Sequence, residues 1–217
     1  CHDCLHRNQM DLSWILRDLL PRHLKIVNVG CQNLGTNDPT HLLIRNHKGQ
    51  ISGFCLDIDT DSLAKADMWL RSLGQKARNF LTVASHVTPG NASHWFFAES
   101  RDTMNATTLI PATVLKVDID TLDDEPIVAE TLHTLRIAGQ PLPLVLVVEY
   151  DSRIPPPFRY RCLRTTDISF PPFYGCQPSL SYWVEFLAGY GYFLFKASDR
   201  DLVFLEESLA NAAAQRD

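Results

Sequence analysis

A chain of 217 residues, of which 45% are hydrophobic and 21% charged, is long enough for one domain with a sizeable core and too apolar to stay disordered. Its longest apolar run, Leu142 to Val148, contains Pro143 and is far too short to cross a bilayer. The net charge of -5 and the lack of a dense basic block among the 20 Lys and Arg residues argue against a nucleic-acid partner.

The six cysteines predict reduced thiols rather than a disulfide framework. Cys31 lies beside a glycine turn and Cys55 lies within an apolar run, as buried free cysteines do. We therefore expect a reduced intracellular compartment, although an oxidised pair of Cys162 and Cys176 stays open as an alternative. Because the chain begins with Cys1 and shows no charged-then-apolar signal pattern, we expect it to be either a trimmed chain or a piece of a longer polypeptide.

The first part of the chain alternates between predicted helices and strands. Apolar residues recur at helical spacing from Met10 to Leu20, so residues 1–24 form a predicted N-terminal helical extension. Lys25 to Val29 is mostly apolar, which is typical of a strand buried on both faces. A turn at Gly30 follows, and then a helix that begins after Asn37 or Asp38 and has Pro39 in its first turn. The next elements are a strand over 51–58, a helix over 60–73 with Asp59 and Asp61 at its start, and a strand over 78–84.

The second part continues this alternation and ends differently. The predicted elements are a short helix over 89–97, a loop over 101–111, a strand over 114–119, a helix over 123–138, a strand over 144–149, a helix over 178–190 and strands over 191–197 and 201–206. Residues 151–176 are rich in proline and aromatic residues, which favours a cover over an active site. Only SDR separates the last two strands, so they must be antiparallel.

These elements predict a single α/β domain over residues 1–217. Helical segments between successive strands require parallel pairing with right-handed crossovers. We therefore expect a three-layer Rossmann-like sheet of about seven strands, mostly parallel with an antiparallel last strand, and helices on both faces.

Acidic residues follow three of the predicted strands. Asp57 ends the second strand, Asp118 and Asp120 follow the fourth, and Glu149 and Asp151 follow the fifth. The carboxyl ends of parallel strands meet at one edge of a sheet, where ligands bind in such folds. Carboxylates there can act as a general base, as an anchor for a ligand's ammonium group, or as ligands for Mg²⁺.

Several stretches of the sequence resemble the class I methyltransferases, and more specifically the FkbM-type methyltransferase family. The resemblance covers roughly residues 25–206, and the stretches that carry it are NVGCQNLGTND, GQISGFCLDIDTDS, SHVTPGN, LKVDIDTLD, VVEYDSRIPPPF and GYGYFLF. It implies S-adenosylmethionine as the cofactor and methylation of a hydroxyl group, often on a sugar or another small molecule.

The candidate site residues come from these strand ends and from the resemblance. Their places at the strand ends make Asp118, Asp120 and Glu149 the catalytic candidates. With the resemblance, the expected cofactor contacts come from Asn28, Gly30, Cys31, Asn33, Asp57, Ile58, Ser85 and Asp118. His86 follows the third strand, where the adenine edge would lie, although a surface histidine is the alternative.

The sequence departs from the family pattern at three places. Asn28 stands where the first motif carries an acid, Gln32 replaces the second glycine of the turn, and Thr121 replaces a glycine after the fourth strand. These changes keep a second hypothesis open, a catalytically silent methyltransferase-like module of a larger protein. A third hypothesis, a nicotinamide-dependent enzyme, would also use Asp57 for a ribose but lacks the G-x-G-x-x-G turn.

Overall fold

The computed structural model describes residues 19–36, 38–97, 112–119, 122–161 and 177–215. Its centre is a seven-stranded sheet with the order β3-β2-β1-β4-β5-β7-β6. The strands are β1 (His23–Val29), β2 (Gln50–Asp57), β3 (Asn79–Ala84), β4 (Val114–Val117), β5 (Val145–Glu149), β6 (Tyr192–Ala197) and β7 (Asp201–Glu206). The first five strands pair in parallel, and β7 runs antiparallel to both of its neighbours.

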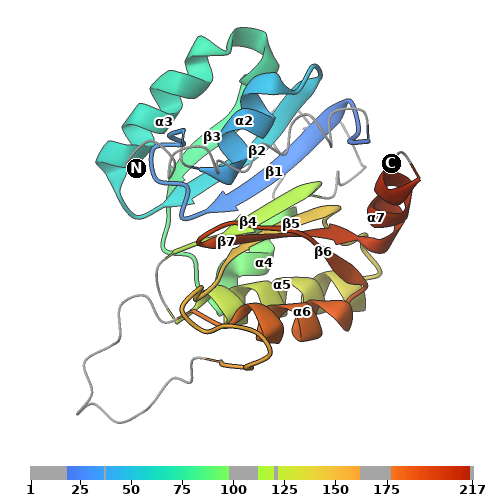
Figure 1. Cartoon of the computed structure of the whole chain (residues 1–217). Coiled ribbons are helices and arrows are strands. Elements are labelled where there is room, and N and C mark those ends of the chain that lie inside the picture. Colours follow the sequence, from blue (N-terminus) through green and yellow to red (C-terminus); the bar gives the residue numbers. More distant parts are fainter. Residues whose placement is uncertain (1–18, 37, 98–111, 120–121, 162–176, 216–217) are drawn as a thin grey trace, which may run out of the picture.

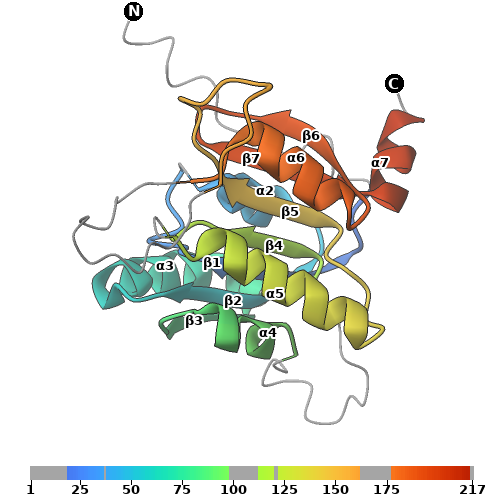
Figure 2. The same ribbon diagram turned by 90° about the horizontal axis from the view of Figure 1, so that it is seen from below.

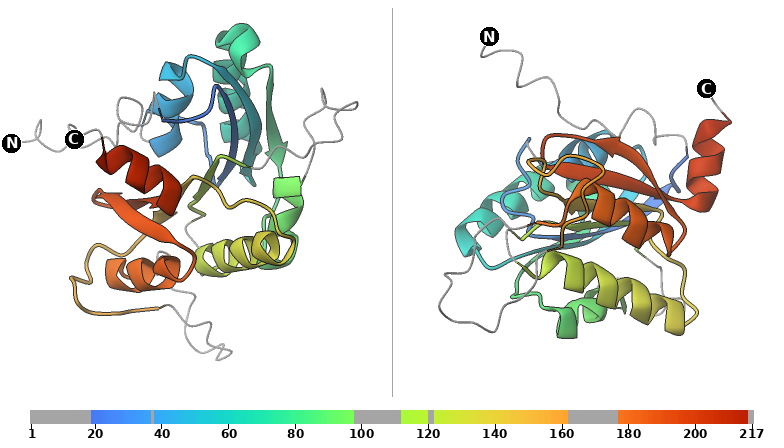
Figure 3. Two further views of the ribbon diagram at one scale, coloured as in Figure 1. Left: turned by 90° about the vertical axis from the view of Figure 1, so that its right-hand side faces the viewer. Right: turned by 60° about the horizontal axis from the view of Figure 1, so that its bottom comes forward.

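Helices cover both faces of this sheet (Figure 1). They are α2 (Pro39–Asn46), α3 (Thr60–Ser72), α4 (Pro89–Phe97), α5 (Asp124–Ile137), α6 (Leu180–Ala188) and α7 (Glu207–Ala214), with a short 3₁₀ helix at Gly74–Ala77. Figure 2 shows α4, α5 and α6 lying across one face, and Figure 3 shows α7 on the other side of the sheet from α6.

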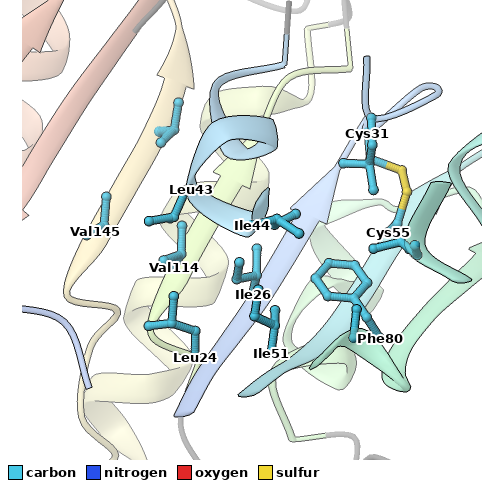
Figure 4. Close-up of a cluster of buried hydrophobic side chains, with 14 of the residues drawn as sticks. Leu24, Ile26, Cys31, Leu43, Ile44, Ile51, Cys55, Phe80, Val114 and Val145 are labelled. Atoms are coloured by element: carbon cyan, nitrogen blue, oxygen red, sulfur yellow. A yellow bond between two sulfur atoms is a disulfide. The ribbon is translucent and has the colours of Figure 1, made fainter. Parts of the chain in front are cut away.

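Two hydrophobic clusters hold these layers together because the strands are buried on both faces. One cluster packs side chains of α2, α3 and α7, such as Ile44 and Leu63, against the sheet. Figure 4 shows part of it, with Ile44 of α2 over Ile26 of β1. The other packs α5 and α6, with Leu132 and Trp183, against the opposite face. Both faces of β4 and β5 are covered, which is why these strands are apolar except for Lys116 and Glu149.

The predicted fold class is confirmed, since the sheet is Rossmann-like and mostly parallel, with an antiparallel strand near its end and helices on both faces. Asp38 caps α2 and Asp59 caps α3, each accepting a backbone N–H of its first turn. Helix α7 follows β7 directly and was not predicted from the sequence. The predicted helix over 10–20 falls almost wholly outside the described residues, and the loop over 101–111 and residues 162–176 of the cover are outside them too. None of the described helices has the length and apolar content that a membrane crossing needs.

The prediction of reduced thiols is wrong for Cys31 and Cys55, which form a disulfide (Figure 4). Cys31 follows the turn at the end of β1, and Cys55 lies in the adjacent strand β2, so their Cα atoms are only 5.5 Å apart. That separation suits a disulfide, and it arises from strand pairing rather than from sequence spacing. Cys162 and Cys176 lie outside the described residues.

Candidate active site

The turn after β1 brings the chain against the end of β4. Gly30 has a φ of +73°, and a Cβ atom at this position would lie 1.6 Å from the carbonyl oxygen of Asp118. Its backbone N–H donates to Leu56 O at 2.9 Å, at the end of β2. Only glycine combines this conformation with this contact. The turn is therefore held between the ends of two neighbouring strands.

The carboxylate of Asp57 is fixed by two backbone donors. The Gln32 N–H donates to Oδ2 at 2.7 Å and the Asp59 N–H donates to Oδ1 at 3.0 Å. Gln32 itself has a φ of +45°, an uncommon conformation for a residue with a side chain. Each carboxylate oxygen can accept more than one hydrogen bond, so Asp57 keeps acceptor capacity for a ligand.

Two adjoining cavities lie at this edge of the sheet. The larger has a volume of about 570 Å³ and the smaller about 200 Å³. Both are lined by Gly30, Gln32 and Asp118, so the turn after β1 forms the boundary between them. The smaller cavity also has Asp57 on its wall. Its other lining residues come from the ends of β1 to β4 and the segments that follow them, and are Val29, Leu56, Ile58, Ser85, His86, Val87 and Ile119.

The larger cavity has a lysine at its base. Lys116 projects from β4, its side chain is 2% exposed, and its Nζ lies 3.0 Å from Asp118 Oδ2 and 3.6 Å from Asp38 Oδ2. The ammonium also donates to Gly30 O at 3.2 Å. Burial disfavours the charge of Lys116, but the carboxylates of Asp38 and Asp118 outweigh burial and raise its pKa. The lysine thus stays charged and links β4 to the turn after β1.

Two more carboxylates face the larger cavity from β5 and β7. Glu149 and Asp201 are directly paired across these strands. Glu149 accepts a hydrogen bond from Gln177 Nε2 at 3.1 Å and lies 3.4 Å from Arg200 Nε. Burial raises the pKa of Asp201 to about 6, and this shift is opposed by the nearby charge of Lys116.

A third buried carboxyl group lies behind the site. Asp124, at the start of α5, accepts the backbone N–H of Ile119 at 3.0 Å and Gln177 Nε2 at 2.6 Å. Burial raises the pKa of Asp124 to about 7. This side chain lines neither cavity, and it holds the segment after β4 on which Asp118 lies.

Eight of the ten predicted site residues line one or both cavities. They are Gly30, Cys31, Asn33, Asp57, Ile58, Ser85, Asp118 and Glu149. Asn28 does not, because its buried side-chain amide donates to Asp38 Oδ2 and Thr40 Oγ1, both at 3.0 Å. Asp120 lies outside the described residues.

Sequence reasoning missed four charged residues of the larger cavity as functional candidates: Asp38, Lys116, Arg200 and Asp201. The sequence contains a signal for two of these residues, Lys116 and Asp201. Lys116 is a charge inside the apolar run of β4. Asp201 begins the antiparallel strand, whose first residue must lie at the edge where the parallel strands end.

The suggestion of a Mg²⁺ site finds no support. Within the described ranges, no three His, Cys, Asp or Glu side chains are grouped as metal ligands. The acids of the larger cavity surround the ammonium group of Lys116 instead, and Asp38 and Asp118 are engaged by it.

Comparisons with known proteins give structural likeness only. No family model and no curated protein matches the sequence. Similar solved structures include an rRNA methylase from Streptococcus thermophilus, with 12% identity over 93% of this chain and 98% of that chain and a TM-score of 0.47. A magnesium protoporphyrin IX methyltransferase from Synechocystis PCC 6803, with bound SAM, has 10% identity, covers 89% of this chain and 75% of that chain, and has a TM-score of 0.48.

A SAM-dependent methyltransferase from Aquifex aeolicus has 12% identity over 94% of each chain and a TM-score of 0.44. With TM-scores below 0.5, these likenesses bear on neither the acceptor nor the role of any residue. The solved structures named here are methyltransferases, and no FkbM-type family model supports the narrower resemblance.

Proposed function

We propose that this protein is an S-adenosylmethionine-dependent methyltransferase that methylates a hydroxyl group of a small molecule or sugar. The observation that carries this proposal is the convergence of residues from the ends of six neighbouring strands on two adjoining cavities, which share Gly30, Gln32 and Asp118. A bisubstrate transfer needs such an arrangement, with one compartment for each reactant and a shared boundary where they meet.

The smaller cavity suits a nucleoside. Asp57 offers fixed acceptor oxygens for ribose hydroxyl groups. Beside it, Ile58 keeps 73% of its surface exposed although it is a large apolar residue, and Val87 and Ile119 add apolar surface to the same cavity. Apolar walls with a few fixed polar groups are typical of a binding site for an aromatic base. The residues present therefore fit the adenosine part of the cofactor.

The boundary between the cavities suits the amino-acid part of the cofactor. Asp118 lines both cavities and offers a carboxylate for an ammonium group. Gly30 lines both cavities, and its lack of a side chain lets the turn after β1 pack against Asp118 at this boundary. In this arrangement Asn28 acts indirectly, since it holds Asp38 rather than reaching either cavity.

The cofactor, when bound, supplies a methyl group on a positively charged sulfur that is already a good leaving group. The protein must then hold the acceptor oxygen in line with that methyl group, exclude water and remove the hydroxyl proton. The larger cavity, with its carboxylates from β4, β5 and β7, is the compartment for the acceptor.

Calorimetric titration with S-adenosylhomocysteine tests this proposal. We expect binding by the wild-type protein, a loss of affinity of at least tenfold in Asp57→Ala, and no change in the matched control Asp61→Asn, an exposed acid on α3 that lines neither cavity. Thermal unfolding of each variant separates a lost ligand contact from a lost fold.

The alternative is a catalytically silent module, which the indirect position of Asn28 favours. No binding at millimolar ligand would contradict the enzyme proposal in favour of this alternative. Wild-type affinity in Asp57→Ala would contradict the assignment of Asp57 alone.

A further inference from the structure

The larger cavity contains four carboxylates among the described residues, and three of them have partners within the protein. Asp38 accepts from Asn28 and from Thr40, and Asp118 accepts from Lys116. Glu149 is engaged by a glutamine and an arginine. These contacts occupy oxygens of the three carboxylates and fix the positions of their side chains.

Asp201 differs from these three. In the part of the chain that the structure describes, its hydrogen bonds are made by its backbone, with Ser198, and its carboxylate has no hydrogen-bond or ion-pair partner. It nevertheless faces the larger cavity and is paired across the sheet with Glu149. Its oxygens are available to a ligand in that cavity.

We propose that the Asp201 carboxylate is the base that accepts the proton of the acceptor hydroxyl group. This inference rests on the methyltransferase function proposed above. In the reaction, the acceptor oxygen forms the new bond to the methyl carbon while the bond from that carbon to sulfur breaks. The electron pair of the broken bond stays on sulfur, the hydroxyl proton passes to an Asp201 oxygen, and solvent later removes it.

The electrostatics of the cavity agree with this role. Burial raises the pKa of Asp201, while Lys116 lowers it and Asp118 and Asp38 raise it. Arg200 adds a nearby positive charge. Glu149 lies opposite Asp201 on the neighbouring strand β5. The hydroxyl group of Tyr150, the next residue in the chain, donates to Ser198 O. A base with a pKa near 6 is ionised at neutral pH and more basic than an exposed carboxylate, as proton removal requires.

Sinefungin provides a test that needs no identified acceptor. In this analogue of S-adenosylmethionine, an amine on carbon replaces the methyl group on sulfur, so its ammonium group occupies the position from which the methyl group is transferred. A base poised for the acceptor's proton lies close to that position and should attract the ammonium group. S-Adenosylhomocysteine has no group at this position and serves as the reference ligand.

We expect calorimetry at pH 7.5 to show that Asp201→Asn lowers the preference for sinefungin over S-adenosylhomocysteine by about tenfold, a typical effect of losing a charge-assisted hydrogen bond. The affinity for S-adenosylhomocysteine should stay within threefold of wild type. The control is Asp199→Asn, an exposed acid in the same turn that lines neither cavity and should retain the wild-type preference.

The pH dependence adds a readout that a merely structural role would not move. The wild-type preference for sinefungin should rise from pH 5 to pH 7.5 as Asp201 ionises, and Asp201→Asn should lack this rise. An unchanged preference in Asp201→Asn, with S-adenosylhomocysteine bound normally, would overturn the role of Asp201 alone. A wild-type protein that binds neither ligand would overturn the methyltransferase function and this inference with it.

Discussion

Lys116 and Asp118, two residues apart at the end of β4, form an ion pair of 3.0 Å whose lysine side chain is 2% exposed. The same ammonium group reaches Gly30 O at 3.2 Å and lies 3.6 Å from Asp38. One buried charge thus connects the end of β4, the turn after β1 and the start of α2. Its removal would leave Asp38 and Asp118 without their shared counter-charge.

Replacement of Lys116 should therefore lower the free energy of unfolding much more than replacement of an exposed lysine. We expect Lys116→Met to lower the free energy of unfolding by about 3 kcal/mol, as is typical when one partner of a buried ion pair is removed. Lys65→Met, on the exposed side of α3, should change it by less than about 0.5 kcal/mol. Urea unfolding at pH 7 measures both, and equal losses in the two variants would contradict the structural role of Lys116.

The close approach of Gly30 to Asp118 predicts that a single methyl group added at Gly30 lowers the free energy of unfolding. Gly30→Ala requires both a left-handed alanine and a movement of the backbone, because the new Cβ would lie 1.6 Å from Asp118 O. Gly139→Ala is the matched control, since Gly139 has a similar φ of +62° and open space around it. The control should lose about 1 kcal/mol from its conformation alone.

We expect Gly30→Ala to lose at least about 2 kcal/mol more than the control, together with most of its affinity for S-adenosylhomocysteine. Chemical unfolding and calorimetry would measure the two effects. If both alanine variants lost the same stability and kept the same affinity, the contact between the turn after β1 and β4 would not matter for the site.

The fold could be predicted from the sequence because its signals are local. Apolar runs, helix caps such as Asp59 and the short SDR connection are each readable within a few residues. Only those site residues that lie at strand ends could be predicted, because parallel strands bring their last residues to one edge of the sheet. Asp57 and Asp118 are predicted to lie at this edge for this reason, and both line the smaller cavity.

What could not be predicted depends on packing between distant segments. The disulfide of Cys31 with Cys55 follows from the pairing of β1 with β2. The Asp201 carboxylate is open to a ligand because the hydrogen-bond donors near it bind neighbouring acids instead. One of these donors is Gln177, which lies 28 positions from its acceptor Glu149. No sequence pattern shows which acid finds a hydrogen-bond partner in the folded chain. The sequence therefore could not distinguish Asp201, the proposed base, from Asp38, Asp118 and Glu149.

The disulfide predicts a specific response to reductant. It closes a loop with a sequence separation of 24, and cross-links of this length contribute about 3 kcal/mol through the chain entropy of the unfolded state. In a chain of this size, such a loss corresponds to a fall in Tm of roughly 10 °C. Calorimetric scans with and without dithiothreitol should show this fall in the wild type.

The control for that measurement is the double variant Cys31→Ala with Cys55→Ala. It should unfold at the lower temperature in both buffers, because its remaining cysteines are not part of this cross-link. A double variant whose Tm still fell by the same amount on reduction would show that another cysteine pair is responsible.

The buried carboxyl group of Asp124 predicts how stability depends on pH. Burial raises the pKa of Asp124 to about 7 in the folded protein, whereas an unfolded chain has an aspartate pKa of about 4. Between these values the folded state binds more protons than the unfolded state, so this group makes stability fall as the pH rises from about 4 to 7. Below that range both states are protonated, and above it both are ionised.

Asp124→Asn removes this titration while keeping an oxygen that can accept the Ile119 N–H. The free energy of unfolding of the wild type minus that of the variant should therefore decrease with rising pH, by up to roughly 1 kcal/mol per pH unit within the window. Asp61→Asn, an exposed acid in the first turn of α3, should show no such slope. A difference between the wild type and Asp124→Asn that stayed constant from pH 4 to pH 8 would mean that Asp124 titrates as an ordinary surface carboxylate, and Asp124 would then carry its charge at every pH at which the site works.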